Sequence, residues 1–197
     1  MNLDKEGRNK HIRRLKHALT KCIVTALSIC WLTLNPSFAQ TSPAPEQQVK
    51  AAYIYNFTRF VDWPLEAFRA ADAPFVIGIL GNDPVSTILD DLVKDEKIGD
   101  HNITVEHYTD LKQVGNCNIL FISAEEAFKN SKLITSINRR GILTVSDVAD
   151  FSKWGGIVRF YKEASKLRLQ INPAEAKAAQ LSISSKLLSI SSIYKAK

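Results

Sequence analysis

Apolar side chains recur at helical spacing near the start of the globular part of the chain. Val49, Tyr53 and Phe57 lie four positions apart, which is the spacing of one face of an α-helix. Pro64 follows soon afterwards, and proline ends helices because its ring removes a backbone donor and clashes with the preceding turn. The pattern therefore predicts an amphipathic helix over residues 49–63.

Short apolar runs alternate with helical patterns over the rest of the chain. The runs that we predict to be strands are 75–80, 103–107, 118–122, 142–145, 157–161 and 167–171. Uninterrupted apolar strands separated by helices are typical of a parallel sheet that helices cover on both faces. The charged connection 162–166 between the last two strands indicates a hairpin. We expect an α/β fold, a three-layer α/β/α sandwich with a mostly parallel sheet and a C-terminal antiparallel hairpin.

Polar side chains follow several of these strands directly. Asn82, Ser123 and Asp147 each stand just beyond the end of a predicted strand. The carboxyl ends of parallel strands meet at one edge of the sheet, and open α/β folds bind ligands at that edge. These three residues are therefore candidate ligand-binding residues. Capping of the next helix or turn explains the same residue types, so both interpretations stay open.

The first forty residues have the three parts of a secretory signal peptide. A basic region is followed by the uncharged apolar run 22–34 and then by Ser37-Phe38-Ala39, a small-x-small cleavage site. The run is shorter than the about 20 residues that a transmembrane helix needs, although an uncleaved anchor is the alternative. We predict a signal peptide over 1–39 that is cleaved after Ala39, a linker over 40–48, a domain over 49–191, and a periplasmic location.

Charge is concentrated in the same N-terminal segment. The chain has a formal net charge of +6, and residues 1–39 account for +5 of it with seven basic and two acidic side chains. The remainder, with 19 basic and 18 acidic residues, is nearly neutral. Nucleic-acid binding requires a strongly basic surface, so we expect no nucleic-acid partner.

Familiar catalytic and cofactor motifs do not occur in the sequence. It contains no G-x-G-x-x-G, no phosphate loop and no G-x-S-x-G. His101 and His107 flank one predicted strand, and an extended chain places them about 20 Å apart, too far to share a metal ion. We therefore predict a domain that is not an enzyme and uses neither a metal nor a cofactor.

Cys117 is the one cysteine that follows the predicted cleavage site. It precedes an apolar run, which favours a buried and unreactive thiol. Export permits disulfides, so a disulfide-linked homodimer is an alternative and Cys117 is a candidate redox residue. A thiol oxidoreductase is a further alternative, but the sequence offers no C-x-x-C partner for this cysteine.

The predicted first helix carries more aromatic side chains than one buried stripe accommodates. Tyr55 and Arg59 stand one turn apart, off the main apolar face, and Trp63 lies at the end of the segment. Aromatic residues and arginine are typical anchors of protein interfaces. We therefore predict that Tyr55, Arg59 and Trp63 bind a protein partner. A core helix with ordinary edge residues is the alternative.

An ordered set of motifs resembles the YfiR family of exported regulators. In chain order the motifs are VKAAYIYNFTRFVDWP at 49–64, ILGNDP at 79–84, CNILFIS at 117–123, LTVSD at 143–147, Gly155-Gly156, Ile171-Asn172 and ISSKLL at 183–188. They extend over nearly all of residues 49–188, and the first of them is the most specific.

The resemblance implies a periplasmic, non-enzymatic α/β protein. The best understood members of that family repress a membrane-bound diguanylate cyclase by binding its periplasmic sensor part, and release raises cyclic di-GMP and promotes biofilm. It therefore implies such a cyclase, or a similar sensor protein, as the partner. A periplasmic small-ligand binding protein is the alternative function. Family members often carry a second cysteine near the position of Gly78, so the resemblance does not extend to control by an internal disulfide.

Overall fold

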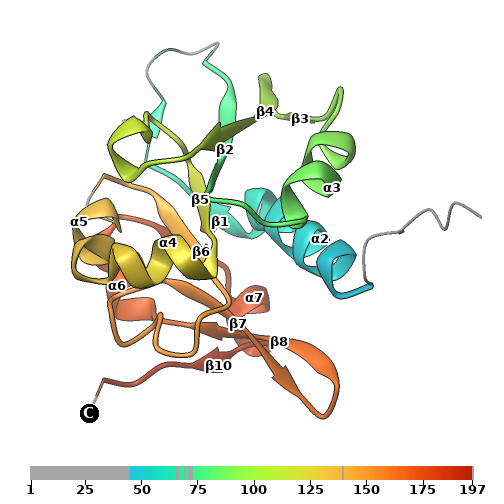
Figure 1. Ribbon diagram of the computed structural model, residues 1–197. Coiled ribbons are helices and arrows are strands. Elements are labelled where there is room, and N and C mark those ends of the chain that lie inside the picture. The colour runs from blue at the N-terminus through green and yellow to red at the C-terminus, as the bar shows by residue number, and fades with distance from the viewer. Residues whose placement is uncertain (1–44, 65–66, 69, 71–72, 139, 197) are drawn as a thin grey trace, which may run out of the picture. The chain divides into compact units, whose positions relative to one another are not determined.

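The computed structural model describes residues 45–196 except 65–66, 69, 71–72 and 139. The predicted signal peptide, its cleavage site and residues 40–44 of the predicted linker lie outside the described residues. The described part is a mixed α/β structure built around an eight-stranded sheet (Figure 1). Among the described residues, no helix combines the length and apolarity needed to cross a membrane.

Helices are distributed along the whole described chain. The α-helices are α2 (Pro45–Phe60), α3 (Val85–Leu92), α4 (Ala124–Lys129), α5 (Ile134–Asn138), α6 (Pro173–Ala178) and α7 (Ser185–Ser189), and the 3-10 helices are η2 (Leu111–Gln113) and η3 (Ser131–Leu133).

Strands alternate with these helices. They are β1 (Val61–Asp62), β2 (Phe75–Leu80), β3 (Lys97–Ile98), β4 (His101–Tyr108), β5 (Ile119–Ile122), β6 (Leu143–Ser146), β7 (Val158–Glu163), β8 (Lys166–Ile171), β9 (Ser182–Ile183) and β10 (Ser192–Ile193).

The large sheet has the strand order β10-β8-β7-β6-β5-β2-β4-β3. Its central strands β4, β2, β5, β6 and β7 run parallel to one another. Strands β7 and β8 form an antiparallel hairpin, and β3 pairs antiparallel with β4 at the other edge. The prediction of an α/β fold with a mostly parallel sheet is therefore confirmed. The short strands β1 and β9 form a separate antiparallel pair.

Strand β2 shows why helices cover both faces of the sheet. All of its residues are buried. Phe75 and Ile77 belong to a core cluster shared with α2 and α3, whereas Val76 and Leu80 belong to a cluster shared with α4 and α5. Successive side chains of a strand point to opposite faces, so each face of β2 packs against its own set of helices.

Helix α2 begins earlier and ends earlier than the sequence pattern predicts. Residues 45–48, which we predicted to be linker, are helical. Proline suits the first helical turn because its missing N–H has no partner there, and Glu46 complements the positive end of the helix dipole. The helix ends at Phe60 because the next two residues form β1 and pair with β9.

Candidate functional site

Lys50 lies at the centre of a charged cluster at the carboxyl ends of the parallel strands. It projects from α2, and only 3% of it is exposed. Its Nζ lies 2.7 Å from Asp147 Oδ2 and 3.3 Å from Glu46 Oε1. Lys162 Nζ lies 2.6 Å from the other carboxylate oxygen of Glu46. The first turns of α2 are thereby joined both to the end of β6 and to the β7–β8 hairpin.

Burial and charge act in opposite directions on these groups. Burial opposes the charge of Lys50, but Asp147 and Glu46 together outweigh it and raise the pKa of Lys50. The hydrogen bond from Lys162 lowers the pKa of Glu46. Burial raises the pKa of the nearby Asp83, and the charge of Lys50 opposes that rise. The charged forms of Lys50 and Glu46 are therefore stabilised by their partners, whereas burial disfavours the charged form of Asp83.

The three candidate ligand-binding residues have different surroundings. Ser123 is buried, and its Oγ accepts a hydrogen bond from the Glu126 backbone N–H at the start of α4. Asn82 is exposed in the turn after β2. Asp147 accepts the hydrogen bond from Lys50. Ser123 therefore caps α4, which is the role that we gave as the alternative to ligand binding. Asp147 has a lysine partner that the sequence pattern did not indicate.

The strand order places the topological switch point of the sheet between β2 and β5, where ligands bind in many open α/β folds. Here the loops that follow these two strands are in direct contact. Gly81 has a φ of +86°, and a Cβ at this position would overlap Ser123 Oγ. A side chain at residue 81 is therefore excluded twice, by the backbone conformation and by the close approach of the two loops.

A cavity of about 340 Å³ lies beside the first turn of α2. Its lining residues are Glu46, Asp147, Arg159, Phe160, Tyr161, Lys162 and Leu167. Strand β6 pairs with β7 only as far as Ser146 opposite Arg159, whereas β7 continues to Glu163. The cavity therefore follows the part of β7 that extends beyond the end of β6, and Asp147 stands where that gap begins.

The partly buried Tyr55 and the exposed Arg59 form a polar group on α2. Arg59 Nη2 donates to the Tyr55 hydroxyl at 2.9 Å, and this hydroxyl donates to Glu96 Oε2 at 2.7 Å. The guanidinium carbon lies 5.3 Å from the centre of the tyrosine ring. The hydrogen bond to Glu96 raises the pKa of Tyr55. These contacts hold the two side chains together at the surface and connect α2 to the turn before β3.

Trp63 has a different environment from Tyr55 and Arg59. Its indole Nε1 donates to the backbone oxygen of Asn118 at 3.1 Å. Its ring lies edge-on to Phe75, with 4.9 Å between the ring centres and an angle of 86° between the planes. Trp63 is partly buried, and it attaches the chain after α2 to the starts of β2 and β5.

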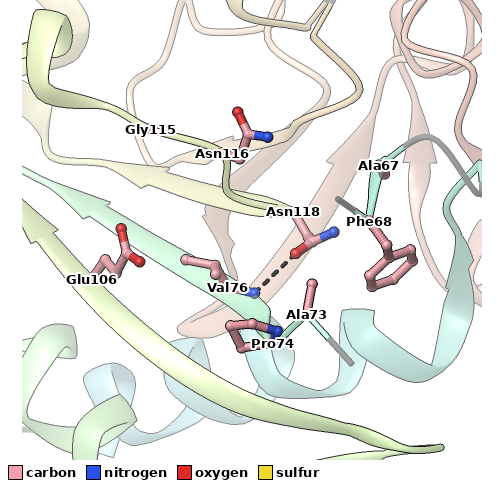
Figure 2. A pocket seen from close by; sticks show the side chains of 9 residues that line it. All are labelled: Ala67, Phe68, Ala73, Pro74, Val76, Glu106, Gly115, Asn116 and Asn118. Atoms are coloured by element: carbon pink, nitrogen blue, oxygen red, sulfur yellow. Dashed lines mark hydrogen bonds between the residues drawn. The ribbon is translucent and has the colours of Figure 1, made fainter. Parts of the chain in front are cut away.

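A second cavity, of about 320 Å³, lies at the amino ends of the strands (Figure 2). Asn118 is one of the residues that line it, and its Oδ1 accepts a hydrogen bond from the Val76 backbone N–H at 2.9 Å. Figure 2 shows Glu106 on one side of this pair and the ring of Phe68 on the other. Asn118 therefore joins two adjacent strand ends with its side chain while its backbone oxygen holds Trp63.

Cys117 is a free and buried thiol. Burial raises its pKa to about 12, so the thiol is protonated at neutral pH and is a weak nucleophile. Gly78 lies beside it on the neighbouring strand, because a Cβ at Gly78 would stand 3.3 Å from Cys117 Sγ. Within the described part of the chain, no group of three or more His, Cys, Asp or Glu side chains is arranged to hold a metal ion.

Sequence reasoning did not identify Lys50 or Glu46 as residues of a site. A signal for both was present. Lys50 stands four positions before Ile54 and seven before Phe57, on the buried stripe of the helix, and Glu46 precedes it by one turn. A buried lysine needs a negatively charged partner, which predicts a counter-charge but does not say where in the chain it lies.

Comparisons with known proteins agree with this architecture. A family model described as YfiR/HmsC-like matches residues 47–192. A search of curated proteins gave no match. Among solved structures, the chain is similar to a conserved domain protein from Vibrio cholerae O1 biovar El Tor strain N16961, with a TM-score of 0.50 and 11% sequence identity. The match covers 76% of this chain and 60% of that one, and at this identity it shows the α/β fold alone.

Proposed function

The chain belongs to the YfiR/HmsC-like family, and from this premise we propose that it represses an inner-membrane diguanylate cyclase. Family membership supports a periplasmic regulatory role in general terms. In the proposed mechanism the protein performs no catalysis. It binds the periplasmic sensor region of the cyclase, or of a similar sensor protein, and so lowers cyclic di-GMP and biofilm formation. Export by the predicted signal peptide, with cleavage after Ala39, is part of this proposal.

The observation that carries the proposal is the group formed by Tyr55, Arg59 and Glu96 on the exposed side of α2. The hydrogen bonds between these residues hold the tyrosine and the arginine in place before any partner arrives. Ordered side chains lose less conformational entropy on binding, and tyrosine and arginine are frequent binding anchors. Trp63 is partly exposed as well, and we keep it in the proposed interface although its indole N–H is used within the fold.

The first test is the concentration of cyclic di-GMP in cells with and without this protein. We expect deletion to raise cyclic di-GMP, and an exported copy of residues 40–197 to restore the lower level. The same residues expressed without an export signal should not restore it, because the proposed contact lies on the periplasmic side. Unchanged cyclic di-GMP on deletion would count against repression.

The interface is tested by the double substitution Tyr55→Ala with Arg59→Ala. We expect this variant to fold and to lose repression, because Arg59 is exposed and Tyr55 is only partly buried. Arg168→Ala is the matched control, since Arg168 is an exposed arginine of the β7–β8 hairpin whose partner among the described residues is the exposed Glu163. Full repression by the folded double variant would remove this surface of α2 from the proposal.

A second candidate function is the binding of a small ligand in the periplasm. The observation in its favour is the cavity of about 340 Å³ that Asp147 lines. Asn82 and Ser123, the other two candidate ligand residues, are not among the residues that line it. The two functions are compatible, because ligand binding at one site is coupled to partner binding at another whenever both bias the same equilibrium.

A homodimer is a separate proposal. Cys117 is buried, so we expect any dimer to be held by non-covalent contacts and to resist separation by reductants. Light scattering with and without a reductant tests both points, and a dimer that dissociates on reduction would contradict the second.

A further inference from the structure

Strand β4 lies near one edge of the large sheet, and β3 covers only part of it (Figure 1). β3 pairs with the first two residues of β4. One further backbone hydrogen bond follows, from the Ile103 N–H to the Glu96 oxygen at 3.0 Å. The neighbouring Asp95 has a left-handed φ of 63°, so the chain leaves the edge there. Within the described part of the chain, the second half of β4 therefore has no strand on its outer side.

The unpaired backbone groups on this side belong to Val105 and His107. Successive residues of a strand direct their N–H and C=O groups to opposite edges. The Tyr108 oxygen accepts from the Gly81 N–H just after β2, whereas Ile103 faces β3, so the odd-numbered residues of β4 face outward. Val105 and His107 therefore present two N–H and two C=O groups that have no backbone partner among the described residues. His107 is exposed, and Val105 is partly exposed.

Glu106, between these two residues, limits the kind of strand that fits the edge. It is exposed, and its carboxylate accepts a hydrogen bond from the Tyr108 hydroxyl. If β4 of a second copy paired through the Val105 and His107 groups about a two-fold axis, Glu106 would stand directly opposite its own copy. Like charges in that position destabilise an antiparallel pair, and opposite charges stabilise it. The edge therefore disfavours a second copy and favours a strand of another protein with a basic side chain opposite Glu106.

This open edge adjoins the partner surface that we propose on α2. Glu96 connects the two places, because its backbone oxygen accepts from the Ile103 N–H at 3.0 Å and its carboxylate accepts from the Tyr55 hydroxyl at 2.7 Å. A protein that contacts Tyr55 and Arg59 therefore has the outer side of β4 within reach. Extended segments bind many domains by adding a strand to an exposed sheet edge.

We propose that the protein partner adds an extended segment to this edge as an antiparallel strand. The segment pairs with Val105 and His107 and places a lysine or arginine opposite Glu106. The antiparallel direction continues that of β3. This inference rests on the proposed binding of a protein partner, and it names the part that the partner contributes.

The probe is the peptide Thr-Val-Thr-Lys-Thr-Val-Thr, blocked at both ends, and its counterpart carries glutamate in place of lysine. The protein, purified as its host exports it, is titrated with each peptide while backbone amides are followed by NMR. We expect the amides of Val105 and His107 to exchange rapidly in the free protein. The lysine peptide, at millimolar concentration, should slow their exchange and shift their resonances saturably. The glutamate peptide should bind about three-fold or more weakly.

Backbone methylation of the peptide tests the strand pairing itself. The nitrogens of the two threonines beside the lysine would face Val105 and His107, so methylation of both should abolish binding. The lysine nitrogen would face away from the edge, so its methylation should leave binding in place.

Substitutions in the protein test the same contact. Glu106→Lys should reverse the preference between the two peptides. Glu163→Lys is the matched control, because Glu163 is an exposed glutamate at the end of β7, and it should keep the preference for the lysine peptide. Should Glu106→Lys fail to fold, Val105→Pro is the second variant. It removes an N–H that faces outward and none that faces β2, so it should fold and lose the peptide.

Slow exchange of the Val105 and His107 amides in the free protein would show that the edge is closed and would overturn the proposal. Equal binding of the two peptides, or retained binding of the peptide that is methylated on both threonines, would overturn it as well. Protection of the same amides that grows with protein concentration, without any peptide, would assign the edge to a second copy instead. Cyclic di-GMP on deletion reports on repression separately, so the peptide result and the proposed function are able to fail independently.

Discussion

The two ends of the α2 segment are attached to the sheet by different kinds of interaction. At the start of the helix the attachment is ionic, through Lys50 with Asp147 and through Glu46 with Lys162. Lys50 is nearly inaccessible to solvent at 3% exposure. Removing one member of a buried ion pair is costly because it leaves the other charge without compensation. This end is therefore strong only while all of its charges are present.

Beyond the end of the helix the attachment is neutral. Trp63 donates to the backbone oxygen of Asn118 and lies edge-on to Phe75. The same backbone oxygen also accepts a hydrogen bond from the Leu143 N–H, so it keeps a partner if the indole is removed. The comparison teaches that one segment is held by a charge network that responds to pH and by a neutral contact that does not.

The largest expected effect comes from breaking the ionic end. We predict that Lys50→Met lowers the free energy of unfolding by about 2 kcal/mol, because Asp147 loses its cation while Glu46 keeps Lys162. Urea unfolding measures this. The control Lys153→Met removes an exposed lysine from its pair with Asp150 and should have a much smaller effect, because solvent screens this surface pair. Equal effects of the two substitutions would mean that burial of Lys50 does not increase the contribution of its ion pair to the free energy of unfolding.

A smaller effect is expected at the neutral end. Trp63→Phe retains the packing on Phe75 but loses the indole N–H, and we predict a loss of about 1 kcal/mol because Asn118 keeps its other donor. This loss should be the same across about pH 5 to 8, since no ionisable group takes part. Unfolding curves at several pH values measure it. A loss that varies with pH would show that the two ends are coupled.

Lowering the pH changes the contribution of the ionic end to stability but not that of the neutral end. We expect this change to be below about 1 kcal/mol, because the carboxylates of Glu46 and Asp83 are partly exposed. Lys162 lowers the pKa of Glu46, so this group contributes stability above its ordinary value of 4.5 that is lost as the pH falls through the lowered value. Burial raises the pKa of Asp83, so its contribution has the opposite sign: it is present below 3.8 and is lost as the pH rises.

Two substitutions check the sign of each contribution. Glu46→Gln should reduce the loss of stability below about pH 4.5, and Asp83→Asn should steepen it, because each removes one of the two opposing contributions. Thermal unfolding between about pH 3 and 7 provides the measurement. A steeper loss with Glu46→Gln would show that its ion pair with Lys162 does not persist in solution.

The smallest effect on stability is expected midway along α2. Tyr55→Phe removes the hydroxyl that joins Arg59 to Glu96, and we predict a change within about 0.5 kcal/mol because these hydrogen bonds are exposed to solvent while the ring is retained. Binding to the proposed partner should weaken much more than stability, because the remaining arginine is no longer held in place. Calorimetric unfolding and a partner-binding assay on the same sample make the comparison. A loss of stability as large as that of Trp63→Phe would assign Tyr55 to the core.

Local features of the sequence predicted most of the secondary structure. Ser123 caps α4, Ser184 caps α7 and Asn172 caps α6, since a capping side chain acts on a backbone group only three residues away. The β7–β8 hairpin also follows from neighbouring residues. The C-terminal end of α2 could not be predicted in this way, because it depends on pairing of β1 with the distant β9.

The sequence by itself determined the α/β architecture, because apolar runs and helix caps are short-range patterns that fix each element locally. Only the tertiary structure decided which charges meet. Asp147 follows Lys50 by 97 positions, and no local spacing encodes that contact. Charges act through space, so their partners depend on the packing of the chain rather than on its order.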